Sequence, residues 1–279
     1  MHAKQEKALK KLLTSLADKY EVASFCNDDP SQFLHWYKKG TDNIELASFI
    51  AAMLAFGSRS QFIPKIRQIL QTADNSSGSI SEWLKNGTYK NDFPTGAKKF
   101  YRFYSYDDMQ IFFDELTAIL TSSKSLGQFF KTRWKQESTK QPEPHLADII
   151  SQSFPKSRIV PKGKNSANKR LHMFLRWMVR QNSPVDLGLW PWYPQADLLI
   201  PLDVHVMQEA QKLGLVEPNK TASRKTALEL TKLMNEFFPE DPARADFALF
   251  GLGIDGGVGA VQKERTALII FKDKRNFLC

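Results

Sequence analysis

The sequence predicts an all-α protein with long loops. Apolar residues recur at spacings of three and four along most of the 279 residues, which is the period of a helix that buries one face. Alternation of apolar and polar residues, the pattern of a half-buried strand, is nearly absent. No apolar run reaches the roughly 20 residues that cross a bilayer, so we expect no membrane span.

Helical periodicity and capping residues predict the elements in chain order. Residues 5–20 repeat leucines at helical spacing, and Asp29 precedes Pro30 at the start of a short aromatic helix, where proline fits the first turn. Asp42 is a plausible N-cap for residues 44–56, which are apolar on nearly all sides, as in a central buried helix. Further helices are predicted over residues 61–72, 112–120, 126–134, 145–154, 168–180, 204–213, 222–237 and 242–251.

The segments between these helices are predicted to be loops. Residues 75–79, 87–96 and 155–166 are rich in glycine, serine or proline, which interrupt helices. Residues 183–199 read as an irregular connection rich in tryptophan and proline. Residues 100–106 contain five aromatic side chains, for which we favour packing in a core. Long loops in a compact domain are often functional.

One polar, proline-containing segment, residues 135–144, has the composition of a linker. It predicts an N-terminal helical region over residues 1–140 and a second helical region over residues 141–279. A chain of this length allows either one large domain or two small ones. The first region is therefore either separate or part of the same fold.

Composition points to the cell interior and to a polyanionic partner. Lys and Arg outnumber Asp and Glu by 39 to 30, a formal net charge of +9, and cations that meet phosphates release condensed counterions. A basic surface that serves only solubility is the alternative. The two distant cysteines, Cys26 and Cys279, and an N-terminus without an apolar signal segment indicate reduced thiols in a cytoplasmic protein. We expect no metal and no cofactor, because the cysteines and histidines are too few and too scattered.

The segment from Ile200 to Val206 is the most informative for function. Asp203 directly precedes an apolar-periodic helix, where an aspartate commonly caps backbone N–H groups. The positive end of the helix dipole keeps a carboxylate ionised, and a fixed anion beside a cleft stabilises developing positive charge. These grounds leave both a capping role and a catalytic role open for Asp203.

The order Pro-Leu-Asp-Val-His-Val, followed by a helix that ends in Lys-Leu-Gly-Leu, is similar to a segment of the helix–hairpin–helix DNA glycosylases. The resemblance implies a two-lobed helical fold with Asp203 as the catalytic carboxylate. His205 matches a position that is usually structural, which favours a packing role.

Residues 167–175 resemble the second hairpin helix of the bifunctional members of this superfamily. Lys169 stands where these members carry the lysine that attacks C1′ of the sugar. A partly desolvated lysine beside a carboxylate can lose its proton and form a Schiff base. A surface lysine in a basic helix is the alternative.

Two departures from the superfamily pattern stand out. Residues 160–164 keep one proline and one glycine of the usual hairpin but lie several positions too early. Lys162 and Lys164 could replace the missing backbone contacts to phosphate by their charge. Lys169 and Asp203 are 34 residues apart (203 minus 169), a long separation that resembles the archaeal 8-oxoguanine glycosylase branch.

That branch holds its purine with a carboxylate and an aromatic ring one helical turn apart, which implies Asp246 and Phe250 here. A helix-start aspartate and a core phenylalanine are the alternative. Flipped bases stack on aromatic or apolar faces, and for the tryptophans between Lys169 and Asp203 stacking and packing are equally open. The expected base pocket contains Asp246, Phe250, Met173, Trp190 and Trp192.

The expected partner is DNA, with RNA left open, and we expect a monomer. Arg59 or Gln61 could reach the duplex from the loop that follows the buried helix. The other residues assigned to DNA binding are Lys162, Gly163, Lys164, Arg170, Arg176 and Arg180.

The resemblance thus predicts a DNA glycosylase, with or without AP lyase activity, that excises a damaged purine such as 8-oxoguanine. The alternative is a non-catalytic nucleic-acid-binding protein on the same scaffold. Residues 42–59, 169–180 and 246–253 also resemble the bacterial DUF2400 family. This second resemblance covers most of the chain and implies no activity.

Overall fold

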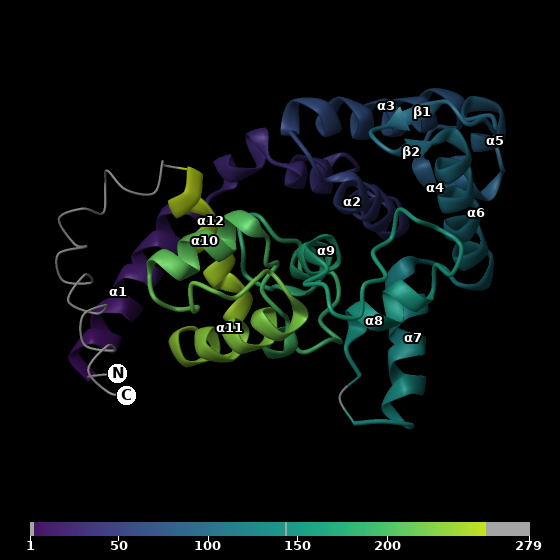
Figure 1. The fold of residues 1–279 in the computed structure, drawn as a ribbon. Helices are drawn as coiled ribbons and strands as arrows, with labels where there is room; N and C mark the ends of the chain where they lie inside the picture. The colour runs from purple at the N-terminus through teal and green to yellow at the C-terminus, as the bar shows by residue number, and fades with distance from the viewer. Residues whose placement is uncertain (1–2, 143, 255–279) are drawn as a thin grey trace. The chain divides into compact units, whose positions relative to one another are not determined.

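The computed structural model describes residues 3–142 and 144–254, and over these residues it confirms the predicted all-α class. Twelve α-helices and four 3-10 helices follow one another in this part of the chain (Figure 1). The only sheet among these residues has two short strands. None of the described helices is both long and apolar enough to cross a membrane.

The chain divides into two compact units that are each assembled from separate stretches. Unit 1 contains the described residues up to Phe25, residues 163–172, and the described residues from Pro194 onward. Unit 2 contains residues 26–162 and 173–193. The chain passes from the first to the second within helix α9 (Lys169–Val179). The predicted division near residue 140 describes a different grouping and stays a prediction.

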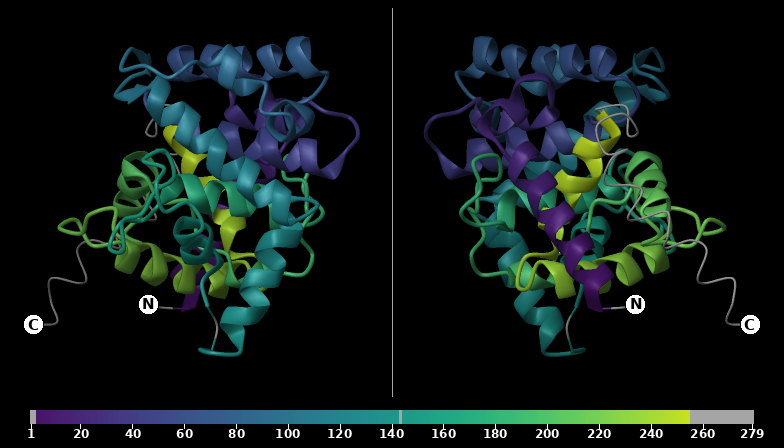
Figure 2. Two further views of the ribbon diagram at one scale, coloured as in Figure 1. Left: turned by 90° about the vertical axis from the view of Figure 1, so that its right-hand side faces the viewer. Right: turned by 90° about the vertical axis from the view of Figure 1, so that its left-hand side faces the viewer.

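Unit 1 packs four long helices around one apolar core. Helix α1 (Ala3–Tyr20) lies against α12 (Ala245–Ile254), and α12 also contacts α10 (Val204–Lys212) (Figures 1 and 2). Helix α11 (Arg224–Phe237) packs with the short η4 (Pro242–Arg244), and η3 (Gln195–Asp197) precedes them. The core includes the leucines that predicted α1, together with apolar residues of the other three helices: Leu9, Leu12, Leu13, Leu16, Val206, Ala210, Leu230, Met234, Ala248 and Leu249.

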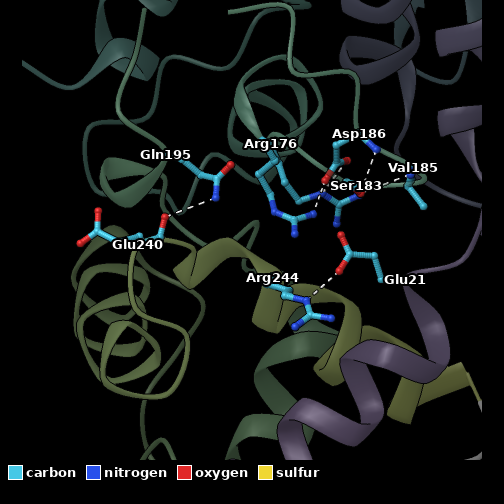
Figure 3. Close-up of polar contacts among 9 residues, drawn as sticks. Glu21, Arg176, Ser183, Val185, Asp186, Gln195, Glu240 and Arg244 are labelled. Carbon is cyan, nitrogen blue, oxygen red and sulfur yellow. Dashed lines mark hydrogen bonds and ion pairs between the residues drawn. The ribbon is translucent and has the colours of Figure 1, made fainter. Parts of the chain in front are cut away.

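The C-terminal end of α1 is held by two kinds of contact. Gly251 of α12 leaves room for the ring of Tyr20, since a Cβ at position 251 would lie 2.1 Å from a ring carbon. Arg244 donates to Glu21 Oε2 at 2.8 Å and to Asp18 Oδ1 at 2.6 Å. Figure 3 shows the side chains of Arg244 and Glu21 turned toward each other. The same figure shows Gln195, whose amide donates to the backbone carbonyl of Glu240 at 3.3 Å.

Unit 2 is built on the buried helix α2, which runs from Thr41 to Leu54. Its residues from Glu45 to Leu54 are all buried, so the predicted central buried helix is confirmed. The other helices of this part of the chain are η1 (Ala23–Asp28, which begins in unit 1), η2 (Pro30–His35), α3 (Arg59–Ser77), α4 (Ile80–Lys85), α5 (Tyr89–Asp92), α6 (Tyr106–Ser122), α7 (Leu126–Ser138) and α8 (Leu146–Gln152).

Three local predictions in unit 2 are wrong. Asp42 does not cap α2, because the helix begins at Thr41 and the Asp42 carboxylate instead accepts from Ser81 Oγ at 2.6 Å and pairs with Lys85 at 3.2 Å. The segments predicted as loops at residues 75–79 and 87–96 contain the end of α3 and the whole of α5. The aromatic segment forms a hairpin of β1 (Lys99–Tyr101) and β2 (Tyr104–Ser105), and its residues Phe100, Tyr101 and Tyr104 are buried, which confirms the favoured core packing for these three rings. Strands this short carry no detectable alternation.

Cysteine and metal chemistry is limited in the described part of the chain. Cys26 is buried as a free thiol, and burial, the largest influence, raises its pKa. Cys279 lies outside the described residues. Within residues 3–142 and 144–254, no group of three or more His, Cys, Asp and Glu side chains could hold a metal ion.

Candidate functional site

Asp203 caps helix α10 and uses its two oxygens for different partners. Its Oδ1 accepts from the backbone N–H of Val206 at 2.9 Å, the bond expected of an N-cap. Its Oδ2 lies 2.5 Å from Lys169 Nζ. Because the cap fixes the carboxylate, the position of the second oxygen is fixed as well.

Lys169 is the first residue of α9, and the loop before it is tied to unit 1. Asn168 has a positive φ of 44°, which asparagine tolerates better than most residues. Its amide nitrogen donates to the Gly163 carbonyl at 2.9 Å, and its backbone N–H donates to Ser166 Oγ at 3.2 Å. Ser166 also forms a β-bridge with Ser223 at the start of α11. These bonds set the point from which the Lys169 side chain projects.

The Lys169–Asp203 pair is partly exposed to solvent. The side chains are 31% and 21% exposed. Burial by itself raises the pKa of Asp203, but the Lys169 charge, its hydrogen bond and the Val206 N–H together hold this pKa below the ordinary value. Asp203 is therefore a carboxylate at neutral pH. An ammonium paired with it has no lone pair, so Lys169 must release a proton before it can attack carbon.

An aromatic ring borders this pair. Lys169 Nζ lies 5.7 Å from the ring centroid of Phe250 in α12, a distance at which a cation is attracted to an aromatic face. The Phe250 ring packs edge-on against Phe25 with centroids 5.8 Å apart. Helices α9, α10 and α12 thus bring three sequence-predicted residues together: Lys169, Asp203 and Phe250. Phe25 gave no signal in the sequence, since it lies outside any periodic segment.

Asp246 and His205, two other residues that the sequence analysis singled out, are close in sequence to Phe250 and Asp203. Asp246 is on α12, four residues before Phe250, and its side chain is buried with 6% exposed. His205, in the first turn of α10, is exposed, so the packing role predicted for it is wrong. Its charge is one of the influences that lower the pKa of Asp203.

The arginines predicted to contact phosphate from α9 do not lie on the surface. Arg176 and Arg180 are 3% and 2% exposed. Both pair with the fully buried carboxylate of Asp186, Arg176 at 3.3 Å from Nε to Oδ1. Figure 3 shows Arg176 directed at Asp186, whose backbone N–H donates to Ser183 Oγ at 3.2 Å. The assignment of these two arginines to DNA binding is therefore corrected: they neutralise a buried carboxylate in unit 2.

Other residues assigned to DNA binding are accessible. Lys162, Gly163, Lys164 and Gln61 are exposed, and Arg170 is half-buried. Lys162 Nζ donates to the Pro155 carbonyl at 2.7 Å. The guanidinium of Arg59 is 3.3 Å from Asp29 Oδ2, with 39% of the side chain exposed.

Trp190 has a structural role in unit 2. It is 1% exposed, and its indole N–H donates to Glu45 Oε1 at 2.8 Å. The other oxygen of Glu45 accepts from the Gly127 N–H at 2.9 Å. Burial, the largest influence, raises the pKa of Glu45. These contacts remove Trp190 from the expected base pocket, because its ring and its only donor are used in the core.

The two other expected pocket residues of unit 2 differ from each other. Met173 is buried, with 7% exposed. Trp192 is half-buried, and its ring lies 5.5 Å from that of Trp190 in a stacked arrangement. Packing accounts for the burial of Met173 and for the ring contact of Trp192.

The geometry defines a helical protein with a solvent-accessible Lys–Asp pair at the start of two helices. Residues 29–255 match the family described as Protein of unknown function (DUF2400). The chain belongs to that family. No curated protein and no solved structure matches it.

Proposed function

We propose that the protein is a DNA glycosylase of the helix–hairpin–helix type, with its two-lobed layout, that excises a damaged purine such as 8-oxoguanine. The observation that carries the proposal is the Lys169–Asp203 pair. Two residues that are 34 positions apart meet at 2.5 Å, and both stay partly exposed. The resemblance to the glycosylase motif assigns the nucleophile and the carboxylate to these same positions.

The pair has the groups that base excision with a covalent intermediate needs. Asp203 accepts a proton from Lys169, and the resulting amine attacks C1′ of the deoxyribose. The C1′–N bond breaks, and its electrons leave with the base, which takes up the proton that Asp203 accepted and so restores the Asp203 carboxylate. The Asp203 carboxylate stabilises the positive charge that develops on the sugar. Opening of the sugar ring then gives a Schiff base at Lys169, and loss of a C2′ proton expels the 3′ phosphate.

Recognition of the substrate is proposed for the other residues that the sequence assigns to base and backbone contacts. The Phe250 ring would stack on the flipped base, and Asp246, one turn earlier on α12, would bind its edge. Exposed side chains would contact the backbone, and the buried Arg176 and Arg180 are left out of that set. The proposed backbone contacts are Lys162, Gly163, Lys164, Arg170, Arg59 and Gln61.

Trapping with borohydride tests the proposal directly. The protein is incubated with duplexes that each carry one damaged purine, including 8-oxoguanine, and the imine is reduced to a stable adduct. We expect an adduct with at least one lesion and its loss in Lys169→Ala. Asp203→Asn should lower the trapping rate by about 100-fold or more, as is typical when a charge-stabilising group is removed.

Lys212→Ala is the matched control for Lys169→Ala. Lys212 is also in unit 1 and also lies 2.5 Å from a carboxylate, that of Glu209. The control variant should trap DNA at the rate of the unaltered protein. If no lesion gives a Lys169-dependent adduct or strand break, the proposed mechanism is wrong.

A non-catalytic nucleic-acid-binding protein is the second candidate. The same ion pair also supports this candidate. It links the start of α9 to the start of α10, a structural role that needs no catalysis. This candidate predicts salt-dependent binding to DNA or RNA that Lys169→Ala and Asp203→Asn leave unchanged, together with no adduct.

A further inference from the structure

The β1–β2 hairpin of unit 2 ends in a strained two-residue turn. Tyr101 pairs with Tyr104 across the hairpin, which leaves Arg102 and Phe103 at the tip. Arg102 has a φ of 50°, a conformation that glycine adopts without cost and arginine does not. Strained backbone of this kind is concentrated at functional sites. The turn keeps an arginine at this position, and its guanidinium lies 5.7 Å from the ring centroid of Phe56.

Phe103 places an exposed aromatic ring on this tip. Half of its surface (50%) is exposed, and it is the only aromatic residue among the exposed large apolar side chains of residues 3–142 and 144–254. The Phe103 ring packs against the ring of Phe56, with centroids 5.3 Å apart, and against the ring of Tyr104, with centroids 4.6 Å apart. Both supports are parts of unit 2, so the ring is presented in a fixed direction.

The exposed charges around the ring are positive. Lys98, Lys99 and Arg102 are all exposed, and Lys99 Nζ donates to the Phe103 carbonyl at 3.1 Å. The neighbouring carboxylates are engaged within the protein. Asp107 Oδ1 accepts from the Gly96 N–H at 2.9 Å, and Asp108 closes the capping box of α6.

We propose that the hairpin tip stacks Phe103 on a nucleic-acid base while the adjacent cations contact the phosphates. An aromatic face accepts any base, and the flanking cations track the backbone. A protein partner is the less favoured occupant, because an isolated ring among three exposed cations matches a phosphate chain better than an apolar interface. This role does not depend on catalysis at Lys169 and uses different residues from the proposed active site.

Binding measured by fluorescence anisotropy tests the proposal on the full chain. Phe103→Ala should weaken binding of an oligonucleotide by about 5-fold to about 100-fold, the range for loss of one base–aromatic stack. Its salt dependence should stay the same, because no charge is removed. Phe103→Trp should bind as the unaltered protein does. Leu228→Ala, at another exposed apolar side chain (38%), is the matched control and should change nothing.

A fluorescent 2-aminopurine base in the oligonucleotide distinguishes binding to a duplex from binding to a single strand. Its fluorescence rises when a ring enters a duplex and separates its neighbours, and falls when the base of a single strand stacks on a ring. Either Phe103-dependent change supports the proposal and identifies the bound form. If Phe103→Ala binds both forms as tightly as the unaltered protein, and neither signal depends on Phe103, the proposal is overturned.

Arg102→Gly gives an independent measurement. Glycine relieves the strain at φ 50° but removes the guanidinium from the Phe56 ring, so the variant should melt at about the same temperature while it binds nucleic acid more weakly. The slope of log K against log salt should decrease by about one for the lost phosphate contact. Unchanged affinity and slope would contradict the phosphate contact. Lys169→Ala should keep full Phe103-dependent binding, which separates this test from that of the glycosylase proposal.

Discussion

At the scale of single residues, aspartates in similar sequence positions have different roles. Asp203 and Asp42 both precede apolar helical segments; the sequence predicts an N-cap at Asp42 and leaves capping and catalysis open for Asp203. Asp203 caps α10 and also pairs with Lys169. Asp42 lies inside α2 and binds α4 through Ser81. The sequence around each aspartate carries the capping signal, but the partner that completes its role comes from a distant segment.

The lowered pKa of Asp203 gives a pH-dependent stability. A carboxyl group whose pKa is lower in the folded state adds stability that is fully present above its unfolded-state pKa, about 3.9. That stability is lost as the pH falls through the folded-state pKa. Asp203→Asn keeps an N-cap acceptor but cannot form the ion pair. The difference in stability between the two proteins should therefore be largest at neutral pH and shrink below about pH 4.

Urea unfolding of both proteins across this pH range measures the difference. Because the other carboxylates titrate equally in both proteins, the comparison isolates Asp203. A gap in unfolding free energy that stays constant from neutral to acid pH would contradict the ion pair as a source of stability.

At the scale of elements, α9 shows how a basic amphipathic pattern misleads. The sequence predicts phosphate contacts for Arg176 and Arg180 because the segment over residues 168–180 is basic. The structure buries both against Asp186, ten and six residues further along the chain. A buried carboxylate needs a compensating charge, and the connection after α9 supplies it. No periodicity within the helix reveals that connection.

Helix α12 offers a prediction about packing within unit 1. In Gly251→Ala the new methyl group would overlap the Tyr20 ring of α1, and overpacking of this kind costs about 1–3 kcal/mol. Gly253 is two residues away, and a Cβ there would lie 3.6 Å from Glu209 Cγ, an ordinary contact. Gly253→Ala should be neutral or stabilise by up to about 1 kcal/mol, since alanine is the better helix former. Thermal unfolding of the two variants makes the comparison, and equal melting temperatures would contradict the close approach of α1 and α12.

At the scale of the whole molecule, each unit is composed of segments that are far apart in the sequence. Unit 1 joins α1 to helices that begin after residue 194, and the leucines of α1 are buried in its core. A linker-like composition at residues 135–144 therefore need not mark the end of a folding unit. Contacts between the two ends of a chain leave no trace in local composition.

This organisation predicts the behaviour of fragments. A fragment of residues 141–279 lacks α1, so much of the apolar surface of α12 loses its partner and the fragment should not unfold cooperatively. Joining residues 1–25 to the fragment should increase its helical content and its resistance to proteolysis. Circular dichroism melts of both fragments and of the full chain provide the measurement. Cooperative unfolding of the shorter fragment would contradict the expectation and support the division predicted near residue 140.

The sequence by itself determined the helical class, the course of most helices and the cap at Asp203. These features depend on neighbours within about four residues, which periodicity and capping signals record directly. Only the tertiary structure decided which side chains meet: Lys169 with Asp203, Arg176 with Asp186, and Trp190 with Glu45. It also decided that Phe103 is exposed while its aromatic neighbours Tyr101 and Tyr104 are buried. The physical reason is that burial and charge pairing depend on segments that are distant in the chain, and the local pattern of residues is the same whichever partner the fold supplies.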